Sequence, residues 1–583
     1  MESHPSFLVT STFFLFLLWL AKTYKQAKAK GVVHNDKLPP GPWKLPLIGN
    51  LHRSTSRGRH TSTSHSSKSS PQVWTFNAPS TGITRKQKVW LIIISCHQAH
   101  GSFPNREPSS TSRGRHTSTP HPSKSSPQIW TFDAPSTGEI SAMVVSSPDM
   151  VKEIMKTHDL NFVQRPQLLC PHIIADGSTN ISFSPYGDYW RQIRKLCTAE
   201  LFSAKRVQSF SFIREDEVAK LIRSIQLCAC EGSQVNVSKT VFSLASTIAS
   251  RAAFGKKSEH EDQLLGLLKQ GVELTGGFDI ADLFPSKKPI HFITGMKAKL
   301  EDMHKELDKI LENIISEHRS KSNHGKGEAG EDFVDVLLRL QQSGSLEIPF
   351  TINNVKAIIW ADRFAAGSDT SATVLEWVMS ELMRNPRVMK KAQAEIREAL
   401  RGKETICESD VHGLMYMKSV IKESMRLHPP APLLLPRECR EGCKIGGYEI
   451  PIKTKVIVNA WALGRDPKYW NDAEKFIPER FDGTSYDFKG NSLEYIPFGA
   501  GRRMCPGILL GLANIELPLA ALLYHFDWEL PNGIKPEELD MTEAFGAAVA
   551  RKNTIFDTNT LSSHFLQLNN SIEDLSRLLM ANL

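Results

Sequence analysis

The chain reads Pro497-Phe498-Gly499-Ala500-Gly501-Arg502-Arg503-Met504-Cys505-Pro506-Gly507, and the apolar, helix-forming stretch 509–523 follows it directly. A cysteine at the start of a helix has its thiolate stabilised by the positive end of the helix dipole. The glycines let the backbone approach a flat ligand and donate amides to sulfur, while Arg503 can pair with an anionic group of that ligand. A lone loop cysteine is usually structural, but the complete pattern F-x-x-G-x-R-x-C-x-G predicts that Cys505 binds haem iron through its thiolate.

With this motif the sequence resembles the haem-thiolate monooxygenases, the cytochromes P450, and within them the plant microsomal members of the 71 clan, of the 71D type. The resemblance covers residues 1–52 and 138–553. It implies a mostly α fold with a minor β part, preceded by a membrane anchor, and haem b as the cofactor. It also implies that Cys505 is the axial ligand of the iron, whose electron donation favours O–O bond cleavage, and that Phe498 packs beside it.

Two charged segments lie upstream of this motif. The segment 422–426 places Glu423 and Arg426 one helical turn apart on one face, and the segment 476–481 adds Arg480. Alone, the first pair would be an ordinary ion pair on a helix surface. The resemblance implies instead that the three residues form a buried charge network that locks the cysteine loop beneath the haem. Such a network fixes geometry more than it adds stability, so the expected role is structural.

A long helix is expected over residues 353–383, with Ala366-Gly367-Ser368-Asp369-Thr370-Ser371 in its middle. Alone, the glycine and the short polar side chains would indicate an exposed kink, because they weaken a helix. The resemblance implies that Asp369 and Thr370 relay protons to dioxygen at the iron. Just upstream, the chain is one residue longer than the family pattern and carries Arg363 where an apolar residue is usual. The helix register there is therefore open.

Further residues are candidates for holding the haem propionates. Trp190 and Arg194 stand on a predicted helix, for which an amphipathic surface helix is the alternative interpretation. The resemblance implies that both hold a propionate, because a guanidinium pairs with a carboxylate through two hydrogen bonds. It also implies that Arg437 reaches a propionate and that residues 433–435 line the substrate pocket.

The amino-terminal part is expected to be a membrane anchor followed by a hinge. Residues 7–21 form an almost unbroken apolar run, and four lysines follow within the next nine residues. This charge asymmetry favours an uncleaved anchor in residues 1–30 over a secretory signal or a buried segment. It places the catalytic part on the cytoplasmic side of the endoplasmic reticulum membrane. Residues 31–52 are rich in proline, which excludes a helix and predicts a stiff hinge.

Two segments do not fit the family pattern. Residues 53–137 contain two copies of one segment, 54–82 and 110–138, which are rich in Ser, Thr, Arg and His and bury too little apolar surface to fold. Residues 554–583 stand where a short final strand is expected. Both junctions with the catalytic domain 138–553 are abrupt. The insertion is therefore expected to be disordered or to come from translated non-coding sequence, and residues 554–583 to be an atypical tail.

Composition and charge fit a globular enzyme rather than a disordered or collagen-like chain. The 583 residues carry a net charge of +9, 40% of them are hydrophobic, and the nine cysteines include no C-x-x-C pair. Neither a disulfide framework nor a zinc site is expected. The basic segment 57–60 lacks an accompanying nucleic-acid-binding fold, so no nucleic-acid partner is expected.

The motifs together predict a membrane-anchored monooxygenase. It would place one atom of dioxygen on an apolar small molecule of plant specialised metabolism and reduce the other with NADPH-derived electrons. Arg191, Lys195 and the positive net charge favour an acidic electron donor, expected to be NADPH-cytochrome P450 reductase. Two alternatives stay open. One is an inactive remnant that binds haem, because of residues 53–137, and the other is an isomerase or dehydratase without dioxygen chemistry, against which Asp369 and Thr370 argue.

Overall fold

The computed structural model describes residues 129–133, 140–231, 233–256, 260–275, 282, 295–322, 331–344, 347–554 and 556–561. Within these residues the chain is mostly helical, and its strands form small sheets. The expected fold class, mostly α with a minor β part, is therefore confirmed. The expected anchor and hinge, residues 1–30 and 31–52, lie outside the described residues.

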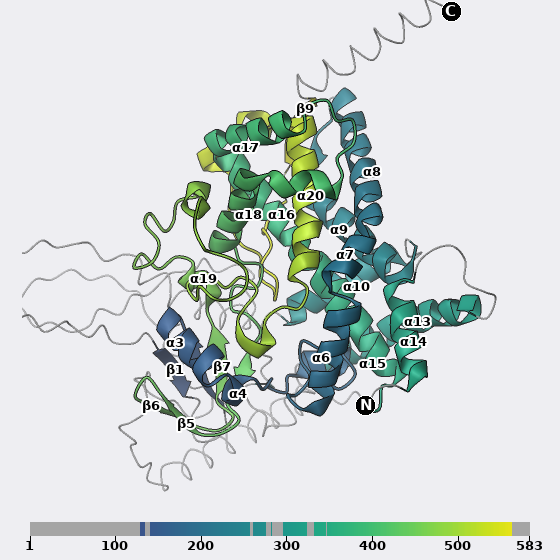
Figure 1. The fold of residues 1–583 in the computed structure, drawn as a ribbon, viewed down its shortest axis with the longest axis vertical. Coiled ribbons are helices and arrows are strands. Elements are labelled where there is room, and N and C mark those ends of the chain that lie inside the picture. The colour runs from purple at the N-terminus through teal and green to yellow at the C-terminus, as the bar shows by residue number, and fades with distance from the viewer. Residues whose placement is uncertain are drawn as a thin grey trace, which may run out of the picture.

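Long helices pack together to form most of this part of the protein. The helices are α3 Pro148–Lys152, α4 Asp159–Phe162, α5 Leu169–Ile174, α6 Asp188–Glu200, α7 Ala204–Ser209, α8 Ser211–Cys230, α9 Val237–Phe254, α10 Glu261–Thr275, α13 Met296–Ser322, α14 Phe333–Ser343, α15 Ile352–Ala357, α16 Ala366–Arg384, α17 Pro386–Ala399, α18 Met415–Leu427, α19 Ala460–Leu463 and α20 Ile508–His525. Figure 1 shows α16 and α20 in the middle of the helical part, with α8 and α9 on one side and α17 and α18 on the other.

Helix α20, which follows the cysteine stretch, is the most apolar of these long helices. It covers the stretch 509–523 that the sequence predicts to be helical. Among the described residues it is the one helix long and apolar enough to cross a membrane, yet most of it is buried inside the protein. Its contacts with α16, α8 and α17 explain that composition, because a helix packed on all sides has no polar face.

The long helix expected over residues 353–383 is a continuous helical run from α15 to α16, joined by the π-helical segment Ile358–Ala365. An extra residue in a regular α-helix turns every following side chain by about 100° around the axis. A π-helical turn accommodates one additional residue, so that the side chains after it point in the same directions as they would without that residue. Trp360 and Phe364, both in this segment, are both buried. The register that the sequence left open is thus resolved by a π-helical turn, and Asp369 lies in regular α-helix.

The strands form three small sheets among the described residues. The strands are β1 Ile129–Asp133, β2 Ser141–Val145, β3 Val235–Asn236, β4 Arg437–Glu438, β5 Cys443–Ile445, β6 Tyr448–Ile450, β7 Lys455–Val458, β8 Phe526–Glu529 and β9 Phe556–Leu561. One of these sheets, β3-β9-β8, lies against α8, α9 and α20. The largest sheet has the order β1-β2-β7-β4, in which β2 and β7 are parallel and the outer pairs antiparallel. Figure 1 shows β1 and β7 beside α3 and α4, below the helical part.

Two strands fall within the segments that do not fit the family pattern. Strand β1 falls within residues 53–137 and pairs with the whole of β2, from Ile129 opposite Val145. Strand β9 falls within residues 554–583 and pairs with both β8 and β3. Aromatic and β-branched residues recur in both segments, and an open strand edge gives such residues hydrogen-bond partners. The other residues of these segments, 53–128, 134–137, 555 and 562–583, lie outside the described residues.

Arg363, in the π-helical segment, is buried without hydrogen-bond partners. Its side chain is 1% exposed, and none of its three guanidinium nitrogens has a partner among the described residues. Its guanidinium carbon lies 4.3 Å from the centroid of the Phe333 ring, a cation–π contact that offsets part of the cost. Burial, with the charge of Arg214, lowers the pKa of Arg363 to about 9. Since an apolar residue is usual here, this departure from the family pattern destabilises the chain.

Replacing Arg363 with methionine is expected to raise the free energy of unfolding by roughly 1–3 kcal/mol, because it removes a buried polar group without partners. Chemical or thermal unfolding of the two proteins measures the difference. Arg363→Lys is the control, since it keeps a buried cation and should bring no such gain. A methionine variant no more stable than the parent would contradict the conclusion that buried Arg363 destabilises the fold.

Candidate functional site

The cysteine stretch forms a tight loop in front of α20. A single 3-10 turn, Gly501–Arg503, precedes Cys505, whose backbone N–H donates to the Phe498 carbonyl at 3.0 Å. Gly501 has a φ of +69°, and a Cβ on it would lie 2.3 Å from the Met155 carbonyl oxygen. No side chain fits at that distance, so the close approach of two backbones requires glycine. Backbone contacts therefore fix the loop that carries Cys505.

The surroundings of the Cys505 thiol suit a metal ligand. Burial raises its pKa, although the Gly507 backbone amide and the charge of Arg194 both act to lower it. The protein alone therefore favours the neutral thiol, whereas a bound metal ion deprotonates a coordinating thiol. Phe498 lies beside Cys505 as expected. Its ring packs edge-on against Phe488, with 5.3 Å between the ring centroids.

Four arginines, Arg165, Arg194, Arg437 and Arg503, are gathered in the same region. Burial lowers the pKa of Arg503 to about 9, and the charges of Arg437 and Arg194 contribute to that shift. Burial and the charges of the other three arginines lower the pKa of Arg165 well below its usual value. Like charges this close repel one another, so the cluster favours an anionic ligand. The two propionates of haem are ligands of that kind.

Backbone carbonyls accept hydrogen bonds from all four of these arginines, and those of Ser182, Leu435 and Pro436 accept from Arg165. Trp190 lies with them. The Trp190 indole N–H donates to the Ile181 carbonyl at 3.0 Å, and the guanidinium carbon of Arg503 lies 4.2 Å from the centroid of its ring. A carbonyl accepts a hydrogen bond without neutralising the guanidinium. The structure thus brings all the predicted propionate residues together. The carbonyls do not compensate their charge, but Asp159 compensates part of it through an ion pair with Arg437 at 3.1 Å. The acceptors are the carbonyls of Val163, Ile181 and Ser184 for Arg503, of Ala500 for Arg437, and of Met504 for Arg194.

The three residues of the predicted charge network meet as well. Glu423 accepts two hydrogen bonds from Arg426, at 2.7 and 2.8 Å, and one from Arg480 at 3.0 Å. Glu423 and Arg426 are fully buried. The Ile477 amide also donates to Glu423 at 2.7 Å, and Arg426 donates to carbonyls in residues 464–475. The network therefore ties α18 to loops far away in sequence, and loss of one member would leave a buried charge unpaired.

The predicted proton-relay residues lie in the first turns of α16. The Thr370 hydroxyl donates to the Ala366 carbonyl at 2.6 Å, and Ala366 is exposed while Thr370 is half-buried. Asp369 is buried, and burial together with the charge of Glu376 raises its pKa to about 7. A carboxyl that titrates near neutral pH can both accept and release protons.

A basic cavity of about 610 Å³ opens beside α6. Arg191 and Lys195 of α6 line it together with Arg502 of the cysteine loop. Arg194, one turn along the same helix, reaches the Met504 carbonyl. Trp190 and Arg194 also line this cavity, so helix α6 is both a surface helix and part of the Cys505 region.

Sequence analysis missed three charged residues of this region. Asp159 accepts from Arg437, which lies 278 residues away in the chain, and Arg165 donates to carbonyls 17 and 270 residues away. No local spacing marks such contacts. Asp362 accepts four hydrogen bonds from residues 180–182. Asp362 could have been identified from the sequence as a candidate, because it is an acidic residue in an apolar helical stretch, next to Arg363.

Comparisons with known proteins agree with this site. A family model described as Cytochrome P450 matches residues 127–556. Cytochrome P450 71D8 of Glycine max is 52% identical to this chain over 563 residues, which cover 95% of this chain and 98% of that protein. Premnaspirodiene oxygenase of Hyoscyamus muticus is 46% identical, and 5-epiaristolochene 1,3-dihydroxylase of Nicotiana tabacum 44% identical. Each of these two matches covers 94% of this chain and 97% of the relative.

Solved structures of cytochromes P450 have a fold similar to that of this chain. A zebra fish cytochrome P450 with abiraterone superposes with a TM-score of 0.64 at 25% sequence identity, and the match covers 76% of this chain and 97% of that chain. A structure of a zebra fish cytochrome P450 with progesterone gives a TM-score of 0.62 at 26% identity, with the same coverage.

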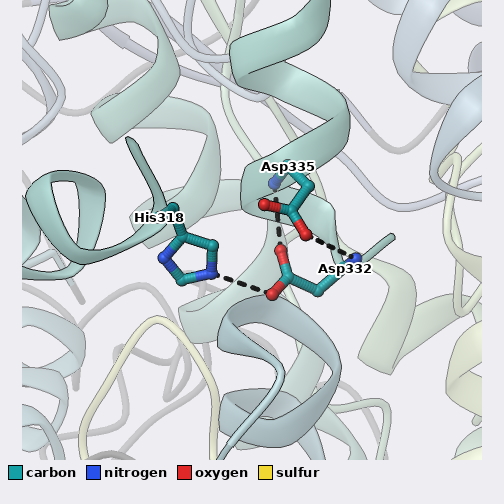
Figure 2. A group of neighbouring side chains, drawn as sticks. All are labelled: His318, Asp332 and Asp335. Carbon is teal, nitrogen blue, oxygen red and sulfur yellow. Dashed lines mark hydrogen bonds and ion pairs between the residues drawn. The ribbon is translucent and has the colours of Figure 1, made fainter. Parts of the chain in front are cut away.

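A second polar cluster joins the ends of two helices. Figure 2 shows His318 of α13 beside Asp332 and Asp335 at the start of α14, with their ligand atoms within 4.8 Å of one another. Asp332 caps α14 by accepting from the Asp335 amide at 2.9 Å. His318 Nδ1 lies 2.7 Å from the Ile314 carbonyl oxygen, and Nε2 lies 2.8 Å from an Asp332 oxygen. In the protonated imidazole both ring nitrogens donate to these oxygens, and in this form the cluster acts as a helix cap.

The charged form of His318 is expected to stabilise the fold. Burial lowers the pKa of His318, but the hydrogen bond and charge of Asp332 raise it by more, to a net value above 6.5. The stabilisation is therefore fully present below about pH 6.5 and is lost as the pH rises through the raised pKa. His318→Gln should lower the melting temperature more at about pH 6 than at about pH 9. The exposed His172→Gln is the control, and a loss that grows with pH would contradict the cap.

Proposed function

The chain belongs to the cytochrome P450 family, and from this premise we propose that it is an active, membrane-anchored monooxygenase that hydroxylates an apolar small molecule of plant specialised metabolism. Its similarity to 71D-type plant members confirms the resemblance expected from the sequence. The observation that carries the proposal is the position of Cys505, at the start of a helix and in the same region as a cluster of mutually repelling arginines. Relatives named as an oxygenase and a dihydroxylase support the reaction class.

Haem b fits the residues gathered in this region. Cys505 would be its axial ligand, while Trp190, Arg194, Arg437 and Arg503 would hold its propionates. Two carboxylates among these side chains would relieve the repulsion between the arginines. When bound, the haem supplies an iron at which dioxygen is activated and from which oxygen is transferred.

The residues of α16 would handle protons in this reaction. Asp369, with a pKa of about 7, is poised to take a proton from water and release it again. The Thr370 hydroxyl would pass the proton on. Its hydrogen bond to the carbonyl of Ala366, an exposed residue one turn earlier in the helix, fixes the orientation of this hydroxyl. The network of Glu423, Arg426 and Arg480 would have a positioning role, holding the loops around Cys505.

Electrons would come from NADPH through NADPH-cytochrome P450 reductase. Arg191, Lys195 and Arg502 form a basic surface around the 610 Å³ cavity and favour an acidic partner. The proposed anchor, residues 1–30, would place this surface at the cytoplasmic face of the endoplasmic reticulum membrane. The reductase acts at the same face.

The second candidate function is that of an inactive haem-binding remnant, and residues 53–137 favour it because they interrupt the family pattern. Strand β1 argues against it, since part of that segment completes an edge of the largest sheet. We propose that the insertion, residues 53–137, stands between the hinge at 31–52 and the catalytic domain at 138–553, and that residues 554–583 are an atypical tail.

The reduced protein with bound carbon monoxide is expected to show the red-shifted Soret band typical of thiolate ligation. Cys505→Ala should lose this band, because Cys505 is the one cysteine in residues 497–507 and the neighbouring Met504 thioether cannot become a thiolate. Cys439→Ala is the control, because Cys439 is a buried cysteine whose sulfur bonds to the Glu441 carbonyl in the sheet region. A full-length protein without the band would support the inactive remnant. The band surviving in Cys505→Ala would refute the ligand.

Thr370→Ala is expected to keep the haem while product formed per NADPH consumed falls by roughly tenfold or more, because a positioned proton donor is lost. Parallel measurement of NADPH oxidation and product formation tests this. Ser371→Ala removes the neighbouring hydroxyl, which bonds to the Gly367 carbonyl, and should change the ratio little. Equal effects of the two substitutions, or loss of haem from Thr370→Ala, would contradict the relay.

A further inference from the structure

A short loop, residues 180–184, lies between the long helical run and the arginine cluster. On one side its amides face Asp362: the Ile181 N–H donates to the carboxylate at 2.6 Å and the Ser182 N–H at 3.1 Å. The Ser182 hydroxyl, at 2.6 Å, and the Asn180 side-chain amide, at 3.2 Å, complete four hydrogen bonds. Asp362 is buried, so this carboxylate binds the loop without competition from water.

On its other side, the same loop presents carbonyls to the arginine cluster. The Ile181 carbonyl accepts from Trp190 at 3.0 Å and from Arg503 at 3.1 Å. The Ser182 carbonyl accepts from Arg165 at 2.9 Å. The Ser184 carbonyl accepts from Arg503 at 2.6 Å.

One peptide group links the two sides. The Ile181 carbonyl and the Ser182 N–H belong to the same planar unit and point in opposite directions. When Asp362 holds the N–H, it also fixes the direction in which the carbonyl meets Trp190 and Arg503. Hydrogen bonds at both ends of one peptide group polarise each other, so the anion on one side strengthens the acceptor on the other.

We propose that Asp362 is a positioning residue for the haem propionate site, acting through the Ile181–Ser182 peptide group on Trp190 and Arg503. The proposal rests on the proposed function, because Trp190 and Arg503 are assigned there to the propionates. Asp362 touches neither of these side chains by any hydrogen bond of the described residues. Its effect passes through the backbone of the loop. The π-helical turn at Ile358–Ala365 matters here, because it keeps Asp362 facing the loop despite the extra residue.

Asp362→Asn in the full-length protein tests the proposal. Asparagine has the same shape but loses the charge and turns an N–H toward the loop. Hydrogen exchange at the Ile181 and Ser182 amides is expected to accelerate by roughly tenfold to hundredfold, the size expected for losing a hydrogen bond to a charged group. This readout needs no haem. In the haem-loaded protein, haem transfer to an excess of apomyoglobin should become several-fold faster, with a shift in the haem midpoint potential.

Ser182→Ala removes one of the four donors and should give a smaller change in the same direction, which keeps the test valid if Asp362→Asn folds poorly. Asp332→Asn is the matched control. It alters another buried carboxylate that accepts from a backbone amide, so it should lower stability without changing exchange at residues 181 and 182 or the haem properties. Unchanged exchange and haem release in Asp362→Asn, or equal changes in Asp332→Asn, would overturn the proposal. Absence of the thiolate band in the parent protein would instead overturn the proposed function, while the exchange measurement would still report on Asp362.

Discussion

Repulsion among buried arginines is the constraint on which the region around Cys505 depends. Burial and mutual charge lower the pKa values of Arg165 and Arg503. The charged guanidinium groups are therefore less stable at these positions in the fold than they would be in water. Carbonyls from loops distant in sequence supply most of the hydrogen bonds to them, which aligns dipoles without cancelling charge. These loops are thereby drawn together around the cysteine stretch. Their arrangement makes physical sense for a ligand that brings carboxylates of its own.

The sequence predicted the parts of this region that depend on local spacing. Cys505 before an apolar helix, and Glu423 and Arg426 one turn apart, are features of a few neighbouring residues, and the structure places them as expected. Asp159 and Arg165 could not be found in this way, because their partners are fixed only by the tertiary fold. Strands β1 and β9 were missed for a related reason. Each of these short segments is a strand because neighbouring strands offer it hydrogen-bond partners, and the position of those partners cannot be read from the segment's own residues.

The helical run across residues 352–384 changes from α-helix to π-helix and back within eight residues. The π-helical turn confines the change, so that α16 continues with its buried face intact. This segment nevertheless contains a destabilising feature, because the Arg363 guanidinium is buried against the Phe333 ring without hydrogen bonds among the described residues. Packing explains why Gly367 matters to this arrangement. A Cβ there would lie 3.0 Å from an Arg363 nitrogen, so the small residue leaves room for the large one.

Two buried carboxyls on this helical run differ in what surrounds them, and this difference separates their roles. Burial raises both pKa values, but at Asp362 four hydrogen bonds from the 180–182 segment oppose that shift and hold the value at about 6. At Asp369 the charge of Glu376 adds to burial, and the value is about 7. Donors aimed at a carboxylate favour its ionised form, which suits a fixed anchor for a loop. A carboxyl whose two protonation states are nearly equal in free energy at neutral pH suits proton transfer. The proposed loop anchor, Asp362, and the proposed proton carrier, Asp369, therefore need no difference in residue type. They need only a difference in how many N–H and O–H groups the neighbouring loop directs at each side chain.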